Sequence, residues 1–139
     1  MTLSIRNQLP GTVTAITPGE VMATVEVRLD GGQDITAAIT REAVKELGLA
    51  EGSAVRALVK STEVSLATGA AEGLSIRNQL PGTVGDVATG GAMASVKVTV
   101  PGCELTAAIT KDAVTDLDLT RGSPVVALIK STEISLAAV

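Results

Sequence analysis

One eleven-residue segment, LSIRNQLPGTV, occurs twice in the chain, at residues 3–13 and again at residues 74–84. The similarity continues beyond it, because the segment TAAIT stands both at residues 36–40 and at residues 106–110. Two copies are too few for a solenoid, so the sequence predicts a duplicated domain. Recent duplication alone would keep the eleven residues identical, and so would a function that substitutions in them would disturb.

The two copies meet in a segment of small residues, TGAAEG at residues 68–73, which is typical of a linker. We therefore divide the chain into a first domain at residues 1–68, a linker at 69–73 and a second domain at 74–139. Neither domain contains Phe, Tyr or Trp, and a core of small aliphatic side chains is marginal in so short a chain. We expect the domains to pack on each other or on other subunits.

Within one copy, period-two alternation and β-branched residues predict strands. A short helix is expected from Arg41 to Leu47, with Thr40 as its N-cap and Gly48 as its stop; the second copy has Asp118 at the stop position. The strands expected in the first copy are 11–16, 21–29, 34–40, 53–60 and 61–67.

This order of elements is that of an OB-type barrel. The predicted fold class is all-β with one short helix per repeat, arranged as two tandem OB-fold-like five-stranded barrels. The segment LSIRN at residues 3–7 precedes the barrel strands. We expect it to be an added strand that is exchanged with another unit.

Composition excludes several classes of function. The formal net charge is −4 with no basic tail and no aromatic residue, which argues against a nucleic-acid partner. The residues include no histidine and one cysteine, Cys103, so neither a general base of the usual kind nor a thiolate metal cluster is expected. No segment reads as a signal peptide or a membrane span. We expect a cytoplasmic protein that is not an enzyme.

Comparison of the two copies separates retained polar residues from variable ones. Many charges change, as Glu26 aligns with Lys97. Carboxylates are retained as well as cations, for example Glu63 and Glu133. The retained residues that could bind an anion are Ser4, Arg6, Asn7, Thr40, Lys60 and Ser61, repeated as Ser75, Arg77, Asn78, Thr110, Lys130 and Ser131.

These side chains are almost all hydrogen-bond donors. Ser4 and Arg6 would point to the same side of a strand, Lys60 adds an ammonium group, and Ser61 adds a hydroxyl and a backbone N–H. Thr40 stands at a helix start, where N–H groups are unpaired. A pocket built from them favours a fully deprotonated tetrahedral oxyanion, because the proton of hydrogen phosphate would find no acceptor.

Each residue also has a purely structural interpretation. Ser4 and Arg6 could form an exposed strand face, and Lys60-Ser61 could be a polar hairpin connection. Thr40 fits a helix cap, and Asn7 could support the following turn through a backbone hydrogen bond.

The unit resembles the Mop domain of molybdate-binding proteins, the molbindins, which is related to the TOBE domains of transporter ATPases. The family signature Ser-Ala-Arg-Asn stands here as Ser4-Ile5-Arg6-Asn7 and is repeated from Ser75 to Asn78. Ala38-Ile39-Thr40 and Val59-Lys60-Ser61 continue the match, again in both copies. Two such units in one chain look like a di-Mop molbindin.

The resemblance implies a homotrimer with exchanged N-terminal strands and oxyanions bound between subunits. Ser4 and Arg6 would come from one subunit or domain, and Thr40, Lys60 and Ser61 from another. Two departures concern affinity: Ile5 and Ile76 replace the small Ala of the signature, and Ala43 and Ala113 stand where some members have a serine.

The implied function is non-catalytic binding and intracellular storage or homeostasis of molybdate or tungstate. No catalytic cofactor is implied, and the metal is bound only as its oxyanion. One alternative is a TOBE-like sensing module that acts on a separate partner protein. Another is a structural trimer whose anion sites are vestigial.

Overall fold

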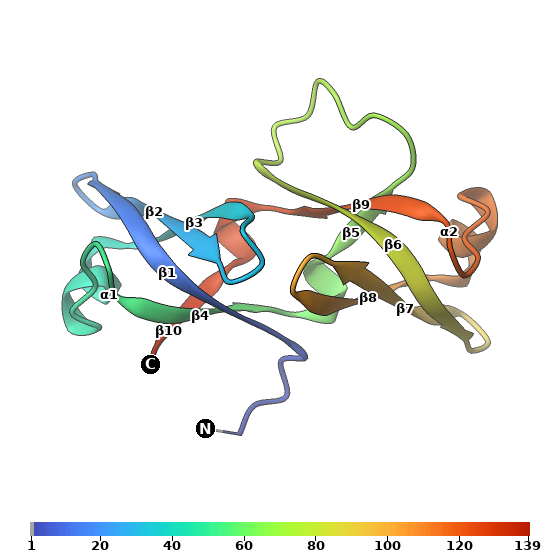
Figure 1. Cartoon of the computed structure of the whole chain (residues 1–139), viewed down its shortest axis with the longest axis horizontal. Coiled ribbons are helices and arrows are strands. Elements are labelled where there is room, and N and C mark those ends of the chain that lie inside the picture. Colours follow the sequence, from blue (N-terminus) through green and yellow to red (C-terminus); the bar gives the residue numbers. More distant parts are fainter. Residues whose placement is uncertain (1) are drawn as a thin grey trace.

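Two five-stranded antiparallel sheets form the fold, and each curls around part of the core (Figure 1). The computed structural model describes residues 2–139. The strands are β1 (Asn7–Pro18), β2 (Met22–Leu29), β3 (Asp34–Thr40), β4 (Ala54–Val59), β5 (Ser65–Ala67), β6 (Asn78–Thr89), β7 (Met93–Val100), β8 (Cys103–Thr110), β9 (Pro124–Ile129) and β10 (Ser135–Ala138). The helices are α1 (Arg41–Glu46) and α2 (Lys111–Asp116), and two 3-10 turns are η1 (Ser61–Glu63) and η2 (Ser131–Glu133).

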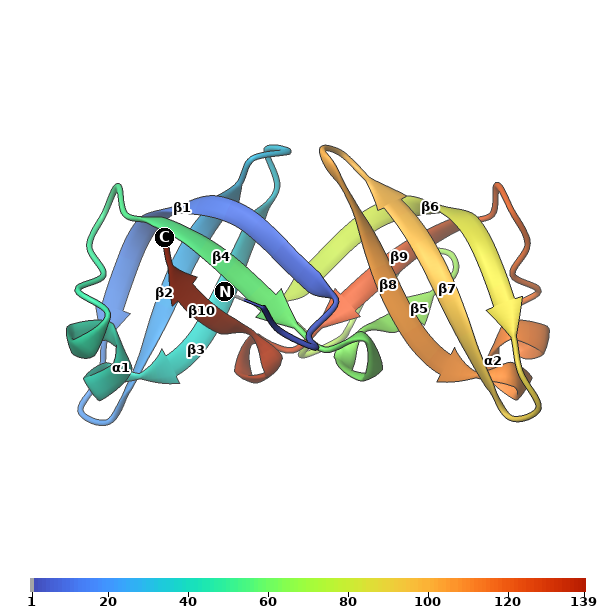
Figure 2. The same ribbon diagram turned by 90° about the horizontal axis from the view of Figure 1, so that it is seen from below.

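Each sheet takes its fifth strand from the other copy. The strand orders are β10-β4-β1-β2-β3 and β5-β9-β6-β7-β8. The register places Ser135 opposite Leu58 and Ser65 opposite Leu128. Figure 2 shows β10 beside β4 at one end of the molecule and β5 beside β9 at the other. The all-β prediction with one short helix per copy is confirmed, and the copies are interlocked by their C-terminal strands.

The strands exchanged within this chain are β5 and β10. Residues 2–6 form no strand within the chain, and their exchange between subunits stays a prediction. The strand expected at residues 61–67 is wrong in its first part, where residues 61–63 form η1. The segment KSTEV that follows β4 has no Gly or Asn for a tight hairpin turn, so the chain leaves its own sheet there.

The core consists of small aliphatic side chains from both sheets. In β2 burial alternates strictly, so Ala23, Val25, Val27 and Leu29 face inward. Val21, which sequence alternation would also place inside, lies before the strand and is 72% exposed. The buried residues of the two copies form one continuous cluster, which confirms that the two small copies pack on each other. No helix within residues 2–139 is long and apolar enough to span a membrane.

The helix ends follow the predicted pattern. Gly48 follows α1 with a φ of 62°, as its role as a stop requires. Asp118 takes the same left-handed conformation after α2, with a φ of 52°, and is the one non-glycine residue with positive φ in residues 2–139. Asp tolerates this conformation better than most residues, so the second helix also stops without a glycine.

The hairpin tips of the two copies lie side by side (Figure 2). Gln33 in the β2–β3 turn donates from Nε2 to the Pro101 carbonyl oxygen at 2.9 Å. A Cβ added at Gly31 would overlap this same carbonyl oxygen, and one added at Gly102 would lie 2.8 Å from the Gly31 Cα. The two turns can therefore meet only because both residues lack a side chain.

We predict that Gly31→Ala destabilises the protein by about 1–3 kcal/mol, because the new methyl group must separate the two tips. Gly91→Ala is the matched control, since nothing lies within 4 Å of a Cβ at Gly91, and it should change stability by less than about 0.5 kcal/mol. Urea unfolding measures both. Equal free energies of unfolding for the two variants would contradict the tip contact.

Candidate functional site

The antiparallel register brings the retained arginine and lysine of each copy together. Asn7 at the start of β1 lies opposite Val59 at the end of β4, so Arg6 and Lys60 are the next residues beyond this pair. Asn78 lies opposite Ile129 in the second copy, which places Arg77 and Lys130 in the same way. Residues far apart in the sequence thus meet at one end of a strand pair.

In the second copy these residues line a cavity of about 250 Å³. Ser75 and Arg77 contribute from the segment before β6, and Lys130 and Ser131 contribute from the end of β9 and the start of η2. All four were selected from the sequence. Ile76 and Thr132 complete the lining. Thr132 was missed, although its retention as Thr62 in the first copy is a signal that could have identified it.

The charge of the cavity is positive. No carboxylate lines it, and the one ion pair within residues 2–139 joins Arg28 to Asp34 at 2.8 Å elsewhere. There the hydrogen bond from Arg28 lowers the pKa of the Asp34 carboxyl. Arg77 and Lys130 are both exposed and keep their charges free for an anion.

Two serine hydroxyls are buried without a hydrogen bond. The Oγ atoms of Ser61 and Ser131 have no partner among residues 2–139, and such a group costs free energy unless something satisfies it. Each serine also begins a 3-10 turn, whose first N–H groups have no partner within the turn. Both kinds of donor belong to residues that directly follow Lys60 and Lys130 in the chain.

The first copy arranges its donors differently. The Arg6 side chain donates from Nε to the Ser4 carbonyl at 3.3 Å and from a terminal nitrogen to the Leu3 carbonyl at 3.2 Å. Lys60 lines a cavity of about 180 Å³ that also contains Glu63 and Glu133. Arg6 is therefore engaged by its own segment, whereas Arg77 opens onto a cavity.

Asn7 and Asn78 occupy a different position from the other selected residues. Each is only 2% exposed, and each amide bonds the backbone of the other copy, Asn7 to Thr106 and Asn78 to Thr36. The cause is the alternation of β1, in which Asn7 and Leu9 point inward while Gln8 does not. Both asparagines are among the anion ligands predicted from the sequence, and in this chain their amides link the two copies.

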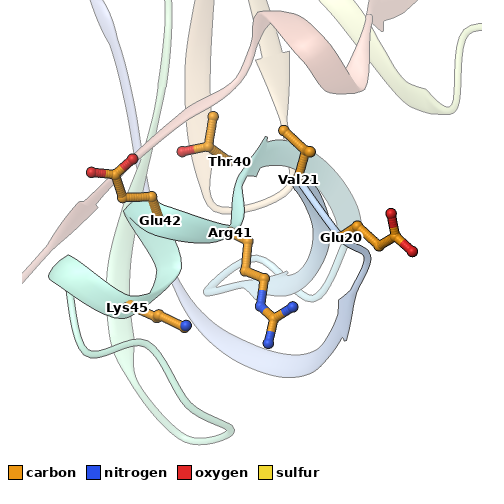
Figure 3. A pocket seen from close by; sticks show the side chains of 6 residues that line it. All are labelled: Glu20, Val21, Thr40, Arg41, Glu42 and Lys45. Atoms are coloured by element: carbon orange, nitrogen blue, oxygen red, sulfur yellow. The ribbon is translucent and has the colours of Figure 1, made fainter.

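Thr40 and Thr110 lie apart from the arginine–lysine pairs. Each caps its helix, with Oγ1 accepting the N–H of Ala43 or Ala113 at 3.1 Å. Thr40 lines a separate cavity of about 480 Å³ between α1 and the β1–β2 turn. Figure 3 shows Arg41 and Lys45 on the side of this cavity away from Thr40. Within one chain, neither threonine is brought to the Arg–Lys cavity.

The chemistry of the second-copy cavity is that of an anion receptor. Its lining supplies a guanidinium, an ammonium and hydroxyl groups, all of which donate hydrogen bonds. The lining contains no carboxylate, histidine or cysteine that could act as a general base or nucleophile.

Comparison with known proteins relates both copies to one family. The TOBE domain family matches residues 3–66 and 74–136. The molybdenum-pterin-binding protein MopB of Rhodobacter capsulatus is 41% identical over 96% of this chain and 50% of its own length. Molybdenum-pterin-binding protein 2 of Clostridium pasteurianum is 44% identical over 48% of this chain and 97% of its own length. The chain thus spans about half the length of the longer curated relatives that it matches, 50% of MopB.

A solved structure matches the whole chain. The crystal structure of the cytoplasmic molybdate-binding protein ModG with molybdate bound has a TM-score of 0.97, 39% sequence identity and complete coverage of both chains. The arrangement of two interlocked sheets is therefore shared with that protein.

We predict that Thr40→Ala lowers the free energy of unfolding by about 1 kcal/mol, because the N–H of Ala43 loses its acceptor. Thr40→Ser keeps the oxygen atom and should cost less. Urea unfolding followed by circular dichroism distinguishes the variants. If Thr40→Ala were as stable as Thr40→Ser, the cap would contribute nothing.

Proposed function

Because the chain belongs to the TOBE domain family, we propose that it is a non-catalytic protein that binds and stores the molybdate oxyanion. The observation that carries the proposal is the cavity in which Arg77, Lys130, Ser75 and Ser131 converge without a carboxylate. The similarity to a molybdate-bound structure over the whole chain supports the identity of the anion.

The donor set suits molybdate for a simple reason. A tetrahedral dianion accepts hydrogen bonds at every oxygen, and each charge-assisted bond contributes about 1.5–3 kcal/mol net. Hydrogen phosphate carries a proton that needs an acceptor, and among these side chains only the hydroxyl oxygens can provide one. Tungstate has the same charge and shape, and we propose that the site accepts it as well.

We further propose that the complete site lies between subunits of a homotrimer. Ser4, Arg6, Lys60 and Ser61 would form one part, with Ser75, Arg77, Lys130 and Ser131 as their counterparts in the second copy. Thr40 and Thr110 would come from a neighbouring subunit, because within the chain they lie in another region. The exposed Val21 and Met22 close to Thr40 are apolar surface that a subunit contact would cover.

The remaining features of the proposal rest on the duplicated sequence and on the similarity to a cytoplasmic molybdate-binding protein. We propose residues 1–68 and 74–139 as the two repeat units and a cytoplasmic location for the stored anion. The donors bind the anion by hydrogen bonds and do not change it chemically.

We predict that wild-type protein binds molybdate more tightly than sulfate or phosphate in titration calorimetry. Arg6→Ala combined with Arg77→Ala should reduce molybdate affinity on the order of tenfold to a hundredfold per site, the loss of one charge-assisted hydrogen-bond donor. Arg56→Ala is the matched control, because Arg56 is an exposed cation on β4 that lines none of these cavities. Equal heats with sulfate and molybdate, or unchanged affinity in the double variant, would reject the proposal.

The subunit arrangement has its own test. Native mass spectrometry of protein prepared with molybdate should show three chains with bound anions, and removal of the anion by dialysis should leave the protein folded. A monomer that binds molybdate with undiminished affinity would rule out a site completed by Thr40 of a neighbour.

A further inference from the structure

Asn7 and Asn78 are the buried polar side chains in the part of the chain that the structure describes, residues 2–139. Each makes the same pair of bonds to the other copy. Asn78 donates from Nδ2 to the Thr36 carbonyl at 2.9 Å and accepts the Thr36 N–H at 2.8 Å. Asn7 makes the equivalent bonds to Thr106 at 2.9 and 2.8 Å.

These bonds substitute for a missing strand. β3 and β8 are edge strands, and an edge residue presents an unpaired N–H and C=O. One primary amide satisfies both groups of the same residue, as a neighbouring strand would do. Because each asparagine begins a strand of one copy and bonds the edge of the other, the two copies are joined at this point.

Asn78 also lies next to residues that line the anion cavity. Asn78 directly follows Arg77. Residues 74–77, which include Ser75 and Arg77, belong to no strand, and Asn78 is the first residue of β6 after them. Its cross-strand partner Ile129 directly precedes Lys130. The turn η2, which contains Ser131, lies against β3, the strand that Asn78 bonds.

We propose that Asn78 and Asn7 are positioning residues. Each fixes the strand that follows the arginine of its own copy by bonding the edge strand of the other copy, and Asn78 thereby holds Arg77 in the anion site. This inference rests on the proposed function. The asparagines do not touch the anion; they fix the backbone from which Arg77 or Arg6 reaches it. The amide therefore restricts the backbone at the arginine before the anion binds. Less conformational entropy is then lost on binding, and the affinity for the anion is higher.

Loss of the side chain has a local and a general effect. Asn78→Ala leaves the N–H and C=O of Thr36 without partners, which lowers stability. Asn7→Ala does the same at Thr106, so the two variants should be destabilised equally. They should differ in which arginine is released, and this difference separates positioning from a merely structural role.

The first experiment measures motion without any anion. Backbone ¹⁵N relaxation should show the order parameter of Arg77 falling from about 0.85 to below about 0.6 in Asn78→Ala, with Arg6 unaffected. Asn7→Ala should show the reverse. If both arginines become mobile in both variants, the asparagines hold only the two copies together and the proposal is overturned. Asn78→Ser and Asn7→Ser, which can keep one of the two bonds, replace the alanine variants if these do not fold.

The second experiment measures molybdate affinity at one site. In an Arg6→Ala background the second-copy site dominates binding. There Asn78→Ala should weaken molybdate binding about tenfold more than Asn7→Ala does. Equal weakening by the two variants would overturn the proposal. If wild-type protein binds no molybdate, the proposed function fails, while the relaxation experiment still decides whether the asparagines position the arginines.

Discussion

The reciprocal pairing of β10 with β4 and of β5 with β9 is the interaction on which the rest of the structure depends. In this structure neither copy completes a five-stranded sheet with its own residues. The buried core is made of Val, Ile, Leu and Ala, which gain less free energy from each buried side chain than aromatic residues would, so a single copy would have little stability to spare. Interlocking joins the buried residues of both copies into one cluster, and the fold gains the size that each copy lacks.

The candidate site uses the ends of strands rather than the core. Arg77 and Lys130 are exposed and unpaired with carboxylates, so no ion pair has to be broken when an anion arrives. The start of η2 adds backbone N–H groups whose direction the turn fixes. Attraction thus comes from the exposed cations, and geometry comes from groups that the turn holds in place.

Much of the fold could be predicted from the sequence. The alternation in residues 21–29 and the cap at Thr40 are local signals, and both elements appear where expected. The partner of the fifth strand could not be predicted, because Ser65–Ala67 would fit the edge of either sheet and only the path after Lys60 decides between them. The pairing of Arg6 with Lys60 and the separation of Thr40 from both depend likewise on long-range register.

The burial of Asn7 could have been predicted from the alternation of β1. Asn7 has the same parity as Leu9 and Val13, and it faces inward with them. Residue type suggested a ligand donor, whereas period-two alternation suggested burial. In a strand the alternation is the stronger constraint, because a side chain that faces the core cannot also reach solvent.

The exchange of strands also fixes the order in which the molecule can be completed. Strand β10 closes the sheet that contains β1, the first strand of the chain. The first sheet therefore stays open until residues 135–138 have been synthesised, and its β4 edge is exposed throughout that time. An open edge can pair with other strands. While the chain is being synthesised, the first copy is therefore open to wrong strand pairing until β10 covers its β4 edge.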